Sequence, residues 1–140
     1  DEPTTGLDPE ERIRIRNLLV DFGRDRSVLF SSHVVEDLAS TCNDLCILKK
    51  GKKIYDGTIQ HLICEADNHV FSCMLSSEEE FLKVQEKYKI TGKNYSNEGI
   101  DIRLVSKSVP DVTGIEFQYV KPTLEDAYIY KSSSEKFEEI

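Results

Sequence analysis

The sequence predicts an α/β fold in residues 1–65 and a small α+β fold in residues 66–140. In the first part, an apolar stripe at helical spacing precedes Ser27–Ser31, an apolar run of strand length. In the second part, short strand-like runs outnumber helices and are separated by turn residues. Ala66–Asn68 interrupts both patterns, so we place the boundary between the two folds there.

The first part begins with a helix. Asp8 is a good N-cap, Pro9 suits the first turn, and the acids that follow favour the positive end of the helix dipole. The apolar stripe of this helix consists of Ile15, Leu18, Leu19 and Phe22. The run at 28–31 then predicts a buried strand of a parallel sheet, and a second helix is expected over 34–41.

Two short strands, 45–48 and 53–55, flank a Lys-Gly turn and predict a hairpin. Thr58 then caps a helix that runs to about Glu65. The order helix, strand, helix, hairpin, helix is typical of the end of an α/β nucleotide-binding domain.

The second part is expected to contain one helix over 77–88, in which Phe81, Val84 and Tyr88 fall on one side and should be buried. A final helix should begin at Pro122, and the polar tail from residue 131 should fray. The expected strands are 70–75, 89–95, 100–105 and 114–120, with a hairpin turn at 97–99.

Composition limits the possible functions. The net charge is −8 and no basic stripe exists, which argues against a nucleic-acid partner. No apolar stretch approaches the ~18 residues that a membrane span needs. The cysteines lack metal-site spacing and lie in apolar segments, so we expect reduced, buried thiols. These residues are Cys42, Cys46, Cys64 and Cys73.

The first nine residues, DEPTTGLDP, carry the strongest chemical signal. Two adjacent carboxylates suit the holding of a hydrated Mg²⁺ and an attacking water beside a nucleoside triphosphate. An exposed acid pair capping a turn is the simpler alternative. The whole run, however, resembles the end of the Walker B motif and the D-loop of ATP-binding cassette (ABC) ATPases, which are P-loop NTPases. The resemblance continues to about residue 63.

The resemblance implies a role for each matching residue. Asp1 would hold Mg²⁺ through water, and Glu2 would be the catalytic glutamate that acts on water beside ATP. The D-loop residues would lie at the interface with a second nucleotide-binding domain, although Asp8 also serves as a plain N-cap. These D-loop residues are Thr5, Gly6, Leu7 and Asp8.

His33 follows the apolar run 28–31, and side chains at the carboxyl end of a parallel strand face the ligand crevice. A lone histidine is more often structural. Here its setting resembles the H-loop of ABC ATPases, which implies contact with the γ-phosphate and with Glu2. His61 and His69 match no pattern, and surface or packing roles are expected for them.

Residues 122–128, PTLEDAY, are similar to the C-terminal stretch of ABC ATPases that partner ABC-2-type export permeases, where it ends an α+β accessory domain. An ordinary capped helix is the alternative. The resemblance implies a membrane permease as partner and a cytoplasmic location at the inner face of the membrane. A soluble ABC ATPase without a permease remains an alternative function, and so does a partner-docking regulatory role for residues 66–140.

Two family motifs are missing from these 140 residues: the phosphate loop G-x-x-x-x-G-K-[ST] and the Leu-Ser-Gly-Gly-Gln signature. The first residue is an aspartate rather than a methionine, which also suggests an excised piece. We therefore expect the isolated chain to lack ATPase activity and to bind no ATP or Mg²⁺, while its parent protein would do both. We further expect the chain to self-associate through the exposed sheet edge at 28–31.

Overall fold

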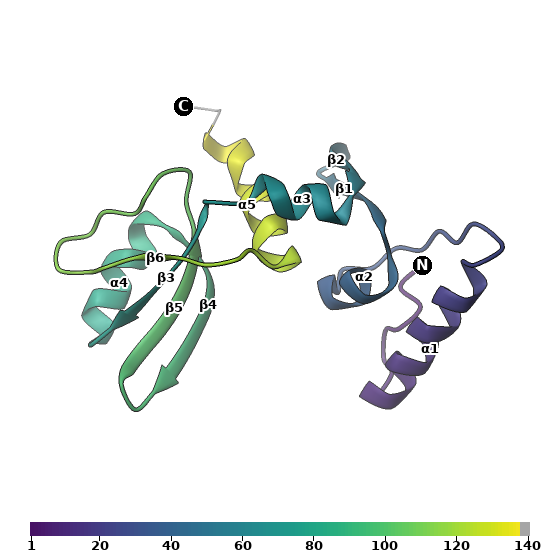
Figure 1. Cartoon of the computed structure of the whole chain (residues 1–140), viewed down its shortest axis with the longest axis horizontal. Coiled ribbons are helices and arrows are strands. Elements are labelled where there is room, and N and C mark those ends of the chain that lie inside the picture. The colour runs from purple at the N-terminus through teal and green to yellow at the C-terminus, as the bar shows by residue number, and fades with distance from the viewer. Residues whose placement is uncertain (138–140) are drawn as a thin grey trace. The chain divides into compact units, whose positions relative to one another are not determined.

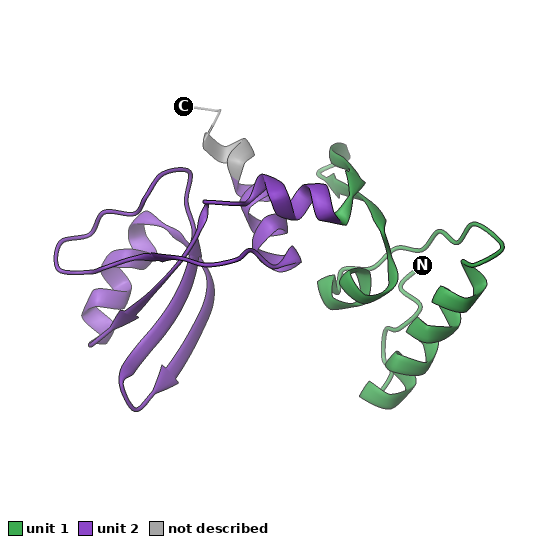
Figure 2. Ribbon diagram, viewed as in Figure 1, with its two compact units in different colours: residues 1–59 green, residues 60–140 purple. Residues whose placement is uncertain are grey.

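The computed structural model describes residues 1–137 and divides the chain into two compact units, Asp1–Ile59 and Gln60–Ile140 (Figure 2). The division falls at the start of a helix, so most of that helix belongs to the second unit. From the sequence we had placed the boundary between the two folds after residue 65. The assignment of 1–65 and 66–140 as the domains of a larger protein stays a prediction.

Both units combine helices with antiparallel sheets (Figure 1). In chain order the elements are α1 (Pro9–Phe22), α2 (Val35–Thr41), β1 (Asp44–Lys49), β2 (Lys52–Thr58), α3 (Ile59–Glu65), β3 (Val70–Leu75), α4 (Glu78–Lys87), β4 (Lys89–Ser96), β5 (Gly99–Val105), β6 (Gln118–Tyr119) and α5 (Leu124–Phe137). None of the helices in residues 1–137 has the length and apolar character that crossing a bilayer requires.

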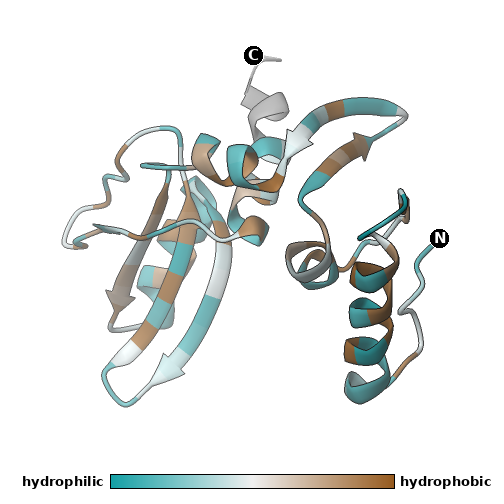
Figure 3. Ribbon diagram, turned by 45° about the vertical axis from the view of Figure 1, so that its right-hand side comes forward, coloured by the Kyte–Doolittle hydropathy of each residue, from teal (hydrophilic) through white to brown (hydrophobic). Residues whose placement is uncertain are grey.

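Helix α1 starts as predicted. The side chain of Asp8 caps it by accepting a hydrogen bond from the amide of Glu11 at 3.0 Å, and Pro9 occupies the first turn. The predicted apolar stripe is not buried, however, since Leu18 and Phe22 each remain 43% exposed. Apolar segments along α1 are visible in Figure 3. Within this unit α1 packs chiefly against α2, which leaves most of the stripe without a partner surface.

The strand predicted over residues 28–31 is wrong. These residues have no regular secondary structure, and Leu29 is fully exposed. A strand needs neighbouring strands to accept and donate its backbone hydrogen bonds, and no strand of the described residues pairs with this run. Among the described residues, its backbone hydrogen bonding consists of one bond, from the amide of Glu2 to the carbonyl of Ser31 at 2.7 Å.

The hairpin of β1 and β2 is confirmed, with Ile47 opposite Tyr55 and a bulge after Ile47. Both residues are buried. The tip contains Lys50 and Gly51, each with a positive φ (49° and 76°), a conformation that glycine adopts without strain. The predicted helix after Thr58 is also confirmed as α3.

The second unit is built on a four-stranded antiparallel sheet in the order β4-β5-β3-β6. Apolar residues alternate along β3 and β5, and the register places them opposite one another on the face that packs against α4. These pairs are Phe71 with Leu104, Cys73 with Ile102 and Leu75 with Ile100. Phe81 and Val84 of α4 complete the core as predicted, whereas Tyr88 is only half-buried against it.

The strand predicted over 114–120 shrinks to β6, which pairs only with Phe71 and Ser72 at the edge of the sheet. Gly114, with a φ of 83°, lies in a turn just before it, and the chain forms its short strand only afterwards. Residues 131–137 continue α5 rather than fraying, and residues 138–140 of the predicted frayed tail lie outside the described residues.

The cysteines form no disulfide and are free thiols. Cys73 is buried as expected, and burial, followed by the charges of Asp101 and Glu80, raises the pKa of its thiol to about 11. Cys46 and Cys64 are exposed, so the expectation of burial is wrong for them.

Asp126 organises the second unit. Its carboxylate is 2% exposed and accepts bonds from Arg103 of β5 (2.8 Å) and Thr91 of β4 (2.8 Å). It also accepts from the amide of Thr123 at 2.9 Å, while the Thr123 hydroxyl accepts from the Asp126 amide at 3.2 Å. This reciprocal pair is a capping box, so residues 122–126 both start α5 and fix it to the sheet.

Burial raises the pKa of Asp126, but the bonds from Arg103, Thr123 and Thr91 outweigh it and hold the pKa below its ordinary 3.8. A lowered folded-state pKa adds stability above pH 3.8, and that stability is lost as the pH falls through the folded-state value. We predict that Asp126→Asn lowers the free energy of unfolding at pH 7 by about 2–3 kcal/mol. The acid-induced loss of stability should also become shallower.

Urea unfolding followed by circular dichroism, together with amide hydrogen exchange along β5, measures this change. Glu125→Gln, on the exposed side of the same helix turn, is the control. It should leave the free energy of unfolding and the hydrogen exchange along β5 unchanged. Equal destabilisation by the two variants would show that Asp126 has no special role.

Candidate functional site

The N-terminal acids lie on a tight turn. The amide of Thr5 donates to the carbonyl of Glu2 at 3.2 Å, and the amide of Leu7 donates to the carbonyl of Thr4 at 3.3 Å. Glu2 has a φ of 43° and Gly6 a φ of 79°. A left-handed glutamate is uncommon, and such residues persist where the surrounding structure holds them, often at functional sites.

This turn meets the segment before α2. The Nδ1 atom of His33 contacts the Oε1 atom of Glu2, and the hydroxyl of Ser31 donates to a carboxylate oxygen of Asp1. The amide of Glu2 also binds the carbonyl of Ser31 at 2.7 Å. Three contacts thus join residues that lie about thirty positions apart. The structure therefore brings together the three residues expected to bind the nucleotide and its metal, namely Asp1, Glu2 and His33.

The cluster remains open to solvent, since the side chain of His33 is 71% exposed and that of Glu2 is 39% exposed. The groups of this cluster that could bind a metal ion are carboxylate oxygens, a hydroxyl and an imidazole. Hydrated Mg²⁺ favours the oxygen ligands among these. Within residues 1–137, no group of three acidic, histidine or cysteine side chains is placed to chelate a metal. A carboxylate oxygen such as those of Asp1 is a ligand that hydrated Mg²⁺ accepts, and the binding of Mg²⁺ by Asp1 stays a prediction.

The residues expected at an interface lie on the outer side of the same turn. Thr5, Gly6, Leu7 and Asp8 are all exposed, and Leu7 leaves 37% of its surface in solvent. The predicted N-cap role of Asp8 is confirmed. Their exposure leaves them available to another protein surface, and the interface itself stays a prediction.

Asp37 of α2 contacts the site, and the sequence analysis did not single it out. Its side chain is 1% exposed and accepts a hydrogen bond from the hydroxyl of Thr4, in the turn after Glu2. On its other side it pairs with Arg12 at 3.2 Å and Arg16 at 3.7 Å, both from α1. Asp37 thus connects the Glu2 turn, α1 and the helix that follows His33.

The spacing of two arginines in the sequence could have predicted a carboxylate partner for α1. Arg12 and Arg16 are spaced four residues apart and so share one helix face. Burial raises the pKa of Asp37, but the bonds from Thr4 and Arg12 and the charges of Arg12 and Arg16 outweigh it. The pKa is therefore lowered, and Asp37 stays ionised.

An apolar groove of about 610 Å³ lies beside Asp1. Its walls come from the irregular run after α1, from α2 and from β1, and include Leu29, Phe30, Leu38, Leu45 and Leu48. Leu29 and Leu48 are largely exposed, at 100% and 72%. The groove therefore offers apolar surface next to the acidic cluster.

We predict that Thr4→Val loosens the turn, because it removes one donor from the buried Asp37 carboxylate at a cost of about 1–3 kcal/mol. The pKa of Asp37 should rise, and amide exchange at Thr5 and Leu7 should become faster. NMR titration of the carboxyl carbons and hydrogen exchange measure these effects. Thr5→Val, which alters the exposed neighbour, is the control; identical behaviour of the two variants would contradict the role given to Thr4.

The chain is similar over most of its length to known ATP-binding proteins. No protein-family model matches the chain. A Nod factor export ATP-binding protein I from Rhizobium meliloti (strain 1021) is 30% identical over 144 residues, which cover 92% of this chain and 40% of that protein. The protein of the same name from Burkholderia thailandensis is 29% identical over 138 residues, covering 92% of this chain and 44% of the relative.

A third relative, from Rhizobium leguminosarum bv. viciae and again named Nod factor export ATP-binding protein I, is 42% identical over 69 residues, or 46% of this chain and 21% of its own length. The chain thus spans less than half the length of the curated relatives it matches. Over 92% of its length it is homologous to these proteins, which are ABC transporter ATP-binding proteins.

Proposed function

We propose that the chain is part of the ATP-hydrolysing subunit of an ABC exporter, with the first unit from the end of a P-loop NTPase domain. The contact between Glu2 and His33 carries the proposal, because it assembles the two groups that ATP hydrolysis would use from distant parts of the sequence. The relatives, whose names state ATP binding and export, support the same assignment.

Bound Mg-ATP would supply the phosphoryl group and the metal charge. Asp1, one of whose carboxylate oxygens accepts a hydrogen bond from Ser31, would hold the hydrated metal. Glu2 orients the attacking water and accepts its proton, and His33 fixes the Glu2 carboxylate by contacting one of its oxygens. Thr4 and Asp37 hold the turn that presents Glu2, so they are positioning residues.

The other parts of the chain would serve assembly. The exposed turn of Thr5, Gly6, Leu7 and Asp8 would contact a second nucleotide-binding domain. Residues 66–140 would form an accessory domain, and a membrane permease would be the transport partner, which places the protein at the cytoplasmic side of the membrane. The predicted self-association through a sheet edge at 28–31 loses its basis, because this run forms no strand. In the isolated chain, the exposed Leu29 and Leu48 in the groove beside Asp1 would favour self-association instead.

We predict that the isolated 140-residue chain binds Mg-ATP too weakly for calorimetric detection at micromolar concentrations. The acidic pair repels the phosphates unless a nest of amides and a lysine holds them, and the sequence contains no phosphate loop. Isothermal titration with Mg-ATP is the measurement. Micromolar binding that Asp1→Asn abolishes would show that the chain forms a complete nucleotide site.

In the full-length protein, we predict that Glu2→Gln lowers the ATPase rate about 10²–10⁴-fold while nucleotide binding persists, because the amide cannot accept the proton of water. His33→Ala should lower the rate by at least about tenfold through loss of one charge-assisted contact. Steady-state phosphate release and nucleotide binding measure the two effects. The controls are Glu10→Gln and His61→Ala, and near-normal turnover in either site variant would reject the assigned roles.

A further inference from the structure

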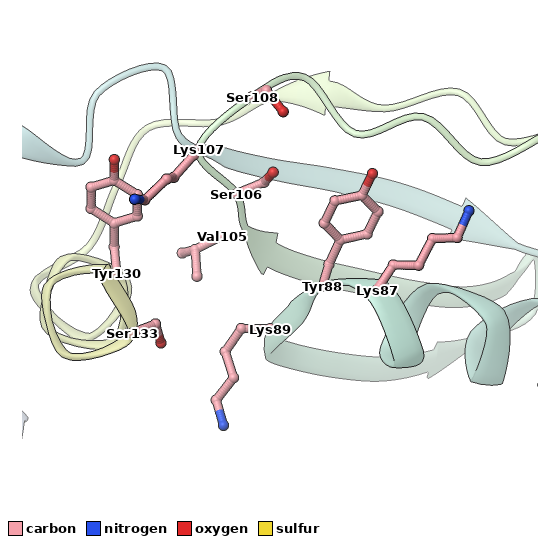
Figure 4. Close-up of a pocket in the computed structure, with 9 residues that line it drawn as sticks. All are labelled: Lys87, Tyr88, Lys89, Val105, Ser106, Lys107, Ser108, Tyr130 and Ser133. Carbon is pink, nitrogen blue, oxygen red and sulfur yellow. The ribbon is translucent and has the colours of Figure 1, made fainter. Parts of the chain in front are cut away.

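The polar groups around a pocket of about 200 Å³ in the second unit do not converge on one point (Figure 4). The ammonium groups of Lys87, Lys89 and Lys107 point in different directions. A ligand site needs a few polar groups that are directed at the same ligand. Such a convergence occurs instead in the first unit, where Ser31 contacts both N-terminal acids.

Ser31 contacts the two acids through different groups. Its hydroxyl donates to a carboxylate oxygen of Asp1, and its carbonyl accepts a hydrogen bond from the amide of Glu2 at 2.7 Å. Asp1 and Ser31 also line the same groove. The side chain of Ser31 therefore acts on Asp1, whereas its backbone acts on Glu2. A change to the hydroxyl alone can separate these two effects.

The hydroxyl of Ser31 orients the Asp1 carboxylate. Both residues are exposed, so packing against other side chains does not hold the aspartate in one rotamer. A hydroxyl donor is uncharged and occupies one of about four acceptor positions of a carboxylate. The contact therefore leaves the negative charge of Asp1 and most of its acceptor positions available to a cation or to water bound to that cation.

The neighbouring Ser32 uses its side chain differently. Its oxygen accepts a hydrogen bond from the amide of Val34 at 3.0 Å, just before α2. The hydroxyl of Ser32 is thus engaged within its own segment, whereas that of Ser31 contacts a residue 30 positions away. Of these two adjacent serines, Ser31 is the one that contacts the acids.

We propose that Ser31 is a positioning residue whose hydroxyl holds the Asp1 carboxylate ready for the divalent cation of the bound nucleotide. The inference rests on the proposed function, in which Asp1 holds that cation. Without the hydroxyl, each binding event must also order the Asp1 side chain, which weakens metal binding. The carbonyl that accepts from the Glu2 amide is still present in Ser31→Ala. Metal affinity therefore falls, while the rate at saturating metal changes little.

Titration of the full-length protein with Mn²⁺ in the presence of ADP, followed by electron paramagnetic resonance, tests the proposal against a titration of ADP alone. Ser31→Ala should weaken Mn²⁺ binding by about tenfold, as expected for one charge-assisted hydrogen bond. Ser31→Thr keeps a hydroxyl and should restore most of the affinity. Ser27→Ala, which removes a hydroxyl from an exposed position of the same irregular run, is the matched control and should bind Mn²⁺ normally.

The Mg²⁺ dependence of ATP hydrolysis gives a second readout. In Ser31→Ala the Mg²⁺ concentration at half-maximal rate should rise by about tenfold, while kcat at saturating Mg²⁺ stays close to that of the unaltered protein. An equal loss of kcat, or failure of Ser31→Thr to restore metal affinity, would show a merely structural role and reject the proposal.

Asp1→Asn distinguishes failure of this inference from failure of the proposed function. Normal Mn²⁺ affinity in Ser31→Ala, beside weakened affinity in Asp1→Asn, would overturn the role of Ser31 and leave the metal role of Asp1 in place. Normal affinity in Asp1→Asn would overturn that metal role, and the inference about Ser31 with it.

Discussion

The buried carboxylate of Asp37 is the interaction on which the first unit depends. Burial of a lone charge is costly, and the structure offsets that cost with a hydroxyl from Thr4 and two guanidinium groups from α1. Those partners come from the turn after Glu2 and from the helix that this turn enters. Because Asp37 lies just after His33, satisfying its charge also brings Glu2 and His33 together.

The second unit uses a similar arrangement at Asp126. There one buried carboxylate joins Arg103 of the sheet to the first turn of α5. A buried carboxylate thus helps to fix a helix in both units, and in the second unit it acts beside the buried Leu124 and Ala127 of α5. This matters most in the first unit, where no residue of α1 is buried and apolar packing contributes little to the position of that helix.

Features set by local chemistry were predictable from the sequence. The capped start of α1 at Asp8, the Lys-Gly hairpin and the alternation along β3 all depend on residues close in the chain. The run 28–31 was predicted wrongly because a strand requires partners that local sequence does not specify. The proximity of Glu2 and His33 was inferred from a family resemblance, whereas the link through Asp37 was missed because an acid in a short helix resembles an ordinary surface residue.

We propose that Asp1, Glu2 and His33 form one side of a Mg-ATP site, and paramagnetic NMR tests this proposal most directly. When Mn²⁺ replaces Mg²⁺ in the nucleotide complex of the full-length protein, relaxation falls off steeply with distance from the metal. We expect strong broadening of the signals from the His33 ring and from the Glu2 and Ser31 amides, with sharp signals around Asp126. Hydrolysis of ATP accompanied by unbroadened His33 and Glu2 signals would contradict it.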